Sequence, residues 1–129
     1  YKDLPEAEIK IVLLKSSGNK EINNKINSKI RKHFKNDSKK EFKIELNTSL
    51  NKEIVSKDTT GKVTNYELIA ITAIKINYKK KSETVIFKES LNIKDIDNTF
   101  EQKKYEDVVK NNFASSIYDK LILKLNTFE

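Results

Sequence analysis

Residues 63–78 read Val63-Thr64-Asn65-Tyr66-Glu67-Leu68-Ile69-Ala70-Ile71-Thr72-Ala73-Ile74-Lys75-Ile76-Asn77-Tyr78, and they carry the clearest structural signal in this chain of 129 residues. From Leu68 to Ile74 both odd and even positions are largely apolar, which is typical of a strand inside a sheet. A polar loop at 57–62 precedes the run, and its Gly61 suits the positive φ angle of a turn. The pattern therefore predicts one long central strand over 63–78.

Strand patterns lie on both sides of this run. Before it, apolar and polar residues alternate over 42–50, which predicts a strand with one wet face, and 53–56 forms its tail. After a lysine-rich turn at 78–82, a further strand is expected over 84–93. Because short loops join these three strands, we expect them to form an antiparallel meander.

A first strand and two helices complete the pattern. Residues 9–14 are apolar on both faces and predict a short buried strand, and 16–19 supply turn and N-cap residues. A helix ending near 36–38 is expected next, because apolar residues recur every four positions at Ile22, Ile26, Ile30 and Phe34. The helical period returns from about Phe100, with apolar residues at Tyr105, Val108, Val109, Phe113, Ile117, Leu121 and Leu125.

The predicted order of elements is β-α-β-β-β-α. Both helices can bury their apolar stripes on one face of a four-stranded sheet, mixed or antiparallel, which gives a two-layer α+β sandwich. The length fits one domain over residues 1–129, in which 1–6 form an extended leader that Pro5 keeps out of a helix.

Composition limits the classes of function. The net charge is +7, and Arg31 is the one arginine among 26 basic residues. Specific readers of nucleic acid or phosphate usually rely on arginine forks, so this lysine surface is weak support for such a role. The frequent Lys, Asn and Ile are also typical of the codon bias of an AT-rich genome. The chain has no cysteine, which excludes disulfides, thiolate metal sites and a cysteine nucleophile.

No catalytic constellation is visible. The single histidine, His33, lies near the end of the first predicted helix, where a cation is favoured by the helix dipole, so a capping role is expected. Gly18 and Gly61 are the only glycines, too few for a phosphate-binding loop. Asp95 and Asp97 lack the further ligands of a calcium loop and are interpreted as turn residues. We expect no enzyme activity, no cofactor and no metal.

Lysines gather at the ends of the predicted strands and at the start of the last helix. They form three groups: Lys57 and Lys62, then Lys79, Lys80 and Lys81, then Lys103 and Lys104. These groups fit a solvated surface, and they also fit a basic rim for an anionic partner such as a phosphorylated glycolipid, a membrane surface or nucleic acid. Lys103 and Lys104 are expected where a helix N-terminus prefers acids, which hints at a role other than stability.

Short motifs give the chain a family resemblance. Gly61 stands five residues before Tyr66 at the start of the long strand, and the chain ends in Asp119-Lys120-Leu121-Ile122-Leu123-Lys124-Leu125. In these features, and in the order of its elements, the chain resembles the LPS-assembly lipoprotein family LptE. The turn at 79–82 lacks the proline and glycine common in that family.

The resemblance implies a lipoprotein on the periplasmic face of the outer membrane, attached through an acylated cysteine upstream of this chain. It implies a plug that helps the β-barrel protein LptD to fold and that binds lipopolysaccharide during its transport. The family's lipopolysaccharide-binding positions fall near Thr59 and Gln102, so it implies ligand-binding roles for the neighbouring lysines Lys57, Lys62, Lys103 and Lys104. It assigns contact with the barrel partner to Lys79, Lys80 and Lys81.

Two alternatives stay open. A basic nucleic-acid-binding domain would present aromatic residues on an exposed sheet face, whereas Phe42, Tyr66 and Phe87 fall on faces expected to be buried, so no nucleic-acid partner is expected. A generic periplasmic binding or interaction domain is the other alternative, with a charge that reflects genome composition alone.

Overall fold

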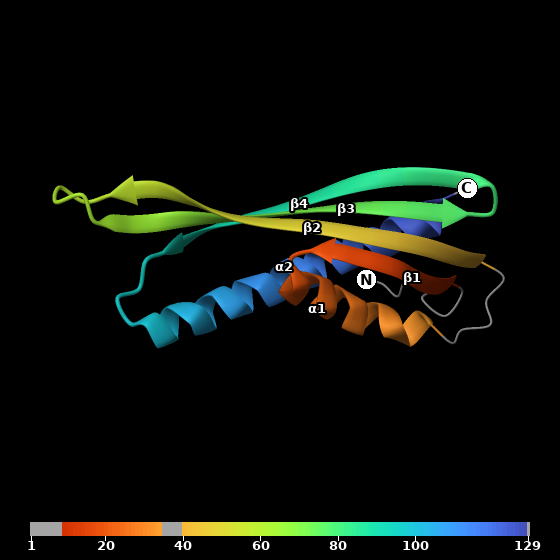
Figure 1. Ribbon diagram of the computed structural model, residues 1–129, viewed down its shortest axis with the longest axis horizontal. Helices are drawn as coiled ribbons and strands as arrows, with labels where there is room; N and C mark the ends of the chain where they lie inside the picture. Colours follow the sequence, from red (N-terminus) through yellow and green to blue (C-terminus); the bar gives the residue numbers. More distant parts are fainter. Residues whose placement is uncertain (1–8, 35–39, 129) are drawn as a thin grey trace.

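Four strands and two α-helices form two layers (Figure 1). The structure is a computed structural model that describes residues 9–34 and 40–128. The predicted order β-α-β-β-β-α is confirmed, and the leader 1–6 lies outside the described residues. The elements are β1 (Ile9–Gly18), α1 (Lys20–Ile30), a 3-10 turn η2 (Arg31–His33), β2 (Lys40–Lys57), β3 (Val63–Tyr78), β4 (Lys81–Lys94) and α2 (Thr99–Thr127).

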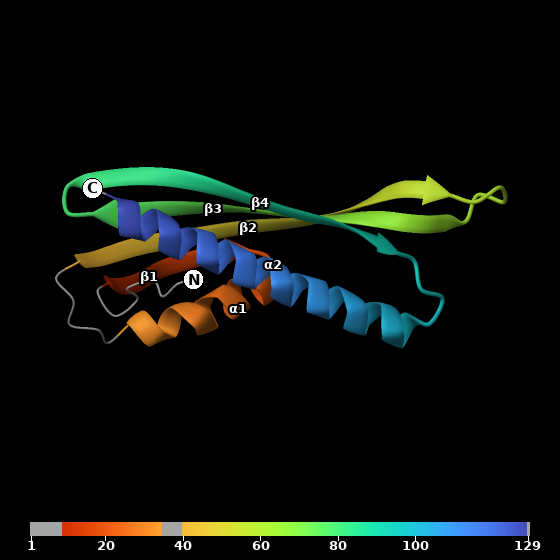
Figure 2. The ribbon, with the colours of Figure 1, turned by 180° about the vertical axis from the view of Figure 1, so that it is seen from behind.

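The sheet is mixed, with strand order β1-β2-β3-β4. β1 pairs with β2 in parallel, and the predicted antiparallel meander of β2, β3 and β4 is confirmed. The pairing of β1 with β2 ends where Gly18 meets Thr48, so the β2–β3 hairpin extends well past β1. Figure 2 shows α1 and α2 on the same face of the sheet, with α2 running along most of its length.

The core lies between the sheet and the helices. The apolar stripe of α1 is buried at Ile22, Ile26 and Ile30, as predicted. On α2 burial begins at Val109 and continues at Phe113, Ile117, Leu121 and Leu125. Val108, which was expected on the same stripe, is 57% exposed, because neighbouring positions of a helix point about 100° apart. The first turns of α2 therefore reach beyond the core.

A chain of buried hydrogen bonds joins α1 to the sheet. Asn23 donates from Nδ2 to the Ser17 carbonyl at 2.7 Å, and its Oδ1 accepts from the Thr48 hydroxyl at 2.7 Å. The Thr48 hydroxyl also lies 2.9 Å from that of Thr72. Asn23, Thr48 and Thr72 are all buried. The three polar side chains satisfy one another inside the core, as buried polar groups must.

Several predicted boundaries are corrected. β1 continues through Ser16 and Ser17 to Gly18, where a turn was expected, with a bulge at Leu14. α1 ends at Ile30 rather than near 36–38, a segment that lies outside the described residues. β2 is one strand of 18 residues instead of a strand and a tail, and β4 begins at Lys81. For the three strands, pairing with a neighbouring strand extends the element past its local signal.

The other face of the sheet is not covered by either helix (Figures 1 and 2). β3 is an interior strand, as predicted, and its outer side chains Ile69, Ile71 and Ala73 are half-buried. On β4, Ile86 pairs with Ala73 of β3, and its side chain is 68% exposed. An apolar stripe thus runs along the centre of the open face.

Candidate functional site

One carboxylate organises the tip of the β2–β3 hairpin. Asp58 Oδ1 accepts hydrogen bonds from the Thr60 hydroxyl at 2.6 Å, the Thr60 N–H at 2.8 Å and the Lys62 N–H at 3.0 Å. These bonds, with the Thr60 hydroxyl contributing most, lower the pKa of Asp58. Gly61 takes the predicted positive φ, 89°. The loop that carries Lys62 is therefore a hydrogen-bonded turn with its own negative charge.

Lys62 ties this tip to the segment before α2. Its Nζ lies 2.7 Å from Asp97 Oδ1, and this hydrogen bond is the main cause of a raised pKa of Lys62. The backbone N–H of Asp95 also donates to the Thr64 carbonyl at 2.9 Å. A lysine that was expected to meet an external anion already has an acid of this chain as its partner.

The start of α2 agrees with the helix dipole. Asn98 caps the helix by accepting from the Glu101 N–H at 3.1 Å, and Glu101 is the acid of the first turn. Lys103 and Lys104 lie beyond this turn, and Lys103 pairs with Asp107 at 3.5 Å. The predicted mismatch between these two lysines and the dipole is therefore wrong.

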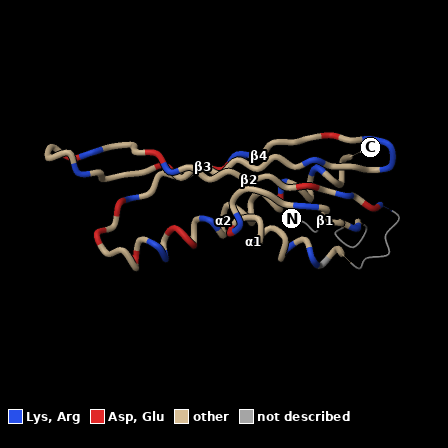
Figure 3. The backbone as a smooth tube through the Cα atoms, in the orientation of Figure 1, with Lys and Arg blue, Asp and Glu red and all other residues tan. Residues whose placement is uncertain are grey.

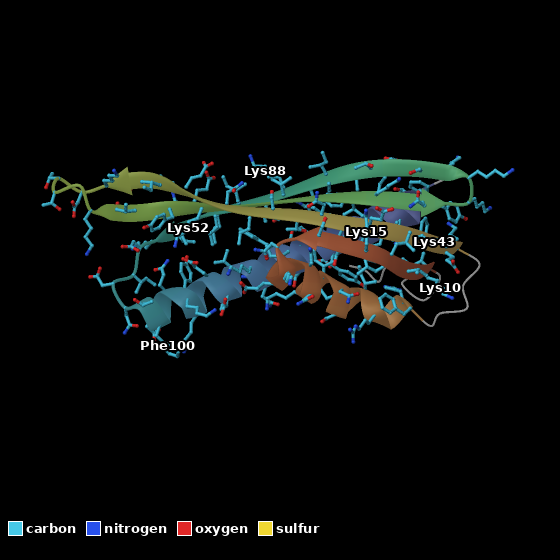
Figure 4. The ribbon with its side chains drawn as sticks, in the orientation of Figure 1. Lys10, Lys15, Lys43, Lys52, Lys88 and Phe100 are labelled. Carbon is cyan, nitrogen blue, oxygen red and sulfur yellow. The ribbon has the colours of Figure 1, made fainter. Side chains whose placement is uncertain are left out.

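Phe100 stands out at the same end of the molecule. Figure 4 shows it at the start of α2, on the side away from the sheet, and its side chain is 67% exposed. Lys104 Nζ lies 5.3 Å from the centre of its ring. The two side chains form a cation–π contact of the exposed and therefore weak kind.

The four lysines predicted to bind lipopolysaccharide thus share one end of the molecule, but they do not form an uncompensated basic patch. They belong to residues 57–62 and 95–104, which contain Lys57, Lys62, Lys103 and Lys104 and also Asp58, Asp95, Asp97 and Glu101. Lysines and acids are equal in number there, and Figure 3 shows the two colours interspersed at this end. The formal charge of these two segments is zero.

An ion pair between the hairpin and α2 was not predicted. Lys52 Nζ lies 2.7 Å from Glu106 Oε2 and 4.4 Å from the centre of the Tyr66 ring. Burial raises the pKa of Glu106, but hydrogen bonds from Lys52 and Gln102 outweigh it, so the pKa is lowered overall. Figure 4 shows Lys52 on the helix side of the sheet and Lys88 on the other. In the sequence, this contact could have been suspected from Lys52, a charged residue at a position of β2 where the alternating pattern directs side chains toward the helices.

The third group of lysines lies at the opposite end of β3. The 16 residues of β3 at about 3.3 Å each place the Lys79–Lys81 turn about 50 Å from the hairpin tip. Residues 78–82 contain three lysines and no acid, and Figure 3 shows this turn in unbroken blue. Contact between Lys79, Lys80 or Lys81 and a barrel stays a prediction.

The single histidine lies in the core. His33 is 2% exposed, and its Nε2 is 3.0 Å from the Tyr118 hydroxyl of α2. It is a buried partner of α2, which corrects the predicted role as a helix cap. Within residues 9–34 and 40–128, no group of three or more His, Asp or Glu side chains is placed to hold a metal ion.

The aromatic residues of the strands face the core, as predicted. Phe42 is fully buried, and Tyr66 and Phe87 are half-buried and pack against the hydrophobic core. Bases stack on aromatic side chains that an exposed sheet face presents. These three side chains provide no such platform.

Within the described part of the chain, every helix is too short or too polar to pass through a bilayer.

No protein-family model matches the sequence, and no curated protein matches it. Solved structures do share its fold. Rare lipoprotein B from Shewanella oneidensis is 17% identical, with a TM-score of 0.66 over 89% of this chain and 91% of that one.

Two other structures extend the likeness. Uncharacterized lipoprotein B from Nitrosomonas europaea is 14% identical, with a TM-score of 0.61 over 99% of this chain and 91% of that one. A putative lipoprotein from Caulobacter crescentus is 13% identical, with a TM-score of 0.58 over 95% and 90%. At these identities the likeness shows a common fold, and it extends over nearly the whole of each chain.

Proposed function

We propose that this chain is a non-enzymatic outer-membrane lipoprotein of the LptE kind, which plugs and helps to assemble an LptD-type β-barrel and binds lipopolysaccharide during its transport. The observation that carries the proposal is the fold shared with rare lipoprotein B from Shewanella oneidensis. The order of elements that carries the resemblance is the order found in the structure.

The architecture supports a protein that works through its surface. β1 and β4 are both edge strands, and one face of the sheet is left open by the helices. Exposed apolar side chains, among them Ile86 on this face and Phe100 at the start of α2, are typical of interaction sites when they are grouped.

For lipopolysaccharide the proposal assigns the end that carries Lys57 and Lys104. Within the described chain neither of these two lysines forms an ion pair, so both can meet a phosphate directly. Lys62 and Lys103 would have to exchange an acid partner for the lipid phosphate. The two unpaired lysines are therefore expected to matter most.

Depletion of the protein in its own organism tests the partnership with the barrel. We expect the amount of mature LptD-type barrel in the outer membrane to fall, while an unrelated outer-membrane barrel keeps its level. Unchanged levels of the LptD-type barrel after full depletion would contradict the proposed assembly role and would favour a generic periplasmic domain.

Binding of purified lipopolysaccharide tests the assigned end. Lys57→Glu with Lys104→Glu should weaken binding, whereas Lys15→Glu with Lys88→Glu changes charge equally on exposed positions of β1 and β4 and should have little effect. Equal losses in both variants would show that only net charge matters.

A further inference from the structure

The turn between β3 and β4 has an unfavourable backbone for its sequence. Tyr78 pairs with Lys81, so Lys79 and Lys80 alone form the loop. Lys79 has a φ of 55°, and it is the one described residue other than glycine with a positive φ. Two-residue hairpin loops favour glycine or asparagine at such a position, because a Cβ there meets the backbone. A lysine kept in this conformation suggests that the side chain has a use.

Lys79 and Lys80 place two positive charges at the tip of this turn. No carboxylate of the described residues forms an ion pair with Lys79 or Lys80, and both side chains are exposed. The nearest acid along β4, Glu83, is already paired with Lys124 at 2.8 Å. The balanced charges at the other end of β3 make the contrast clear. The positive electrostatic potential at this end of the molecule is therefore concentrated at Lys79 and Lys80.

Aromatic rings lie directly beneath these lysines. Tyr78 stacks on Phe42 with ring centres 4.7 Å apart, and it meets Phe128 edge-on at 5.9 Å. Lys79 Nζ lies 5.3 Å from the centre of the Tyr78 ring. A surface hollow of about 420 Å³ is lined by Tyr78 and the three lysines. The turn therefore offers cationic heads above an apolar floor.

We propose that the Tyr78–Lys81 turn binds a phosphate group carried by a lipid. Lys79 and Lys80 would neutralise the phosphate, and the Tyr78 ring and the lysine stems would contact the apolar part next to it. Lysines that snorkel above aromatic side chains suit the boundary between head groups and acyl chains. Free phosphate would use the cations but leave the apolar floor without a ligand. The site needs only this chain and a lipid, so it is independent of the barrel partnership.

Vesicle binding by the purified chain tests the site. The probes are phosphatidylcholine vesicles with and without phosphatidylglycerol. The variant is Lys79→Gln with Lys80→Gln, and its matched control is Lys88→Gln with Lys94→Gln, which removes the same charge from exposed positions of β4. Affinity for the anionic vesicles should fall roughly twenty-five-fold in the first variant, since each lysine near an anionic surface contributes about fivefold. The nearer control position, Lys88, lies seven strand residues or about 23 Å from Lys81, more than two screening lengths, so the control should keep its affinity.

Three results would overturn the proposal. Equal losses in the variant and its control would reduce the effect to net charge. Equal binding to phosphatidylcholine vesicles with and without phosphatidylglycerol would show that the lysines do not respond to a phosphate with net negative charge. If inorganic phosphate at constant ionic strength displaced the protein from the vesicles equally well whatever their lipid composition, the turn would be a site for free phosphate.

Lys79→Gly separates binding from folding at the same turn. Glycine relieves the backbone conformation, so the melting temperature should rise while vesicle affinity falls about fivefold. A rise in melting temperature with unchanged affinity would show that the lysine has no part in binding.

Discussion

Lys62 and Asp97 stand 35 residues apart in the chain, and their charged groups meet at 2.7 Å between the hairpin tip and the segment that leads into α2. The contact fixes which lysines of that end are available to a ligand. It also neutralises one of the four lysines at that end, where lysines and acids are equal in number.

Removing the acid should release the lysine. Asp97→Asn leaves Lys62 without its partner and adds one positive charge to this end, so lipopolysaccharide should bind about fivefold more tightly. The pair is exposed, so the melting temperature should change little. Calorimetric titration with lipopolysaccharide measures the effect, and Asp95→Asn, which breaks no side-chain pair shown by the structure, serves as the comparison. An unchanged affinity for Asp97→Asn would contradict the assignment of this end.

The hairpin tip should respond to acid through Asp58. Its pKa is lower in the folded chain than the ordinary 3.8, so its contribution is fully present above that value and is lost as the pH falls through the folded pKa. Exchange of the Thr60 and Lys62 amide hydrogens, followed by NMR at falling pH, reports the loss. Asp58→Asn should remove this pH dependence. The same dependence in that variant would assign the effect to another group.

Gly18 should tolerate no side chain. It has a φ of 88°, and a Cβ there would lie 2.0 Å from the Thr48 carbonyl oxygen. Gly18→Ala is expected to lower the free energy of unfolding by about 3–5 kcal/mol, from overpacking and the left-handed backbone together. Gly61 has a φ of 89° but no atom within 4 Å of its Cβ position, so Gly61→Ala should cost about 1 kcal/mol. Urea denaturation compares the two, and similar costs would contradict the close approach of β1 to β2.

The buried hydrogen bonds of Thr48 should be needed for stability. Thr48→Val keeps the shape but leaves Asn23 Oδ1 without its donor, which is expected to cost about 1–3 kcal/mol. Thr48→Ser keeps the hydroxyl and loses one methyl group, worth about 0.8 kcal/mol. Thermal denaturation should therefore rank wild type, serine and valine in descending order. A valine variant as stable as the serine variant would mean that the network contributes little.

Local patterns were sufficient for the long elements. β3 was predicted from residue 63 to 78 because its apolar run is bounded by Gly61 and by a lysine turn, and the structure has these bounds. The sequence pattern ends the first strand at residue 14, because Ser16, Ser17 and Gly18 are residue types that favour turns. Their pairing with β2 is a long-range contact that overrides this preference.

Partners of single charges could not be predicted in this way. The sequence predicts Lys62 as a ligand group and Asp97 as a turn residue, but their contact depends on where the chain returns after β4. Lys52 and Glu106 meet for the same reason, 54 residues apart. Sequence locates the lysines on elements, while only the fold shows which of them an acid neutralises.

Purification of the full-length protein from outer membranes of its own organism, through an affinity tag and in mild detergent, tests the partnership on which this account depends. The account predicts that an LptD-type barrel is recovered with it in equal molar amount, while an unrelated outer-membrane barrel stays behind. Recovery of the folded protein without the LptD-type barrel, from membranes that contain the barrel, would contradict it.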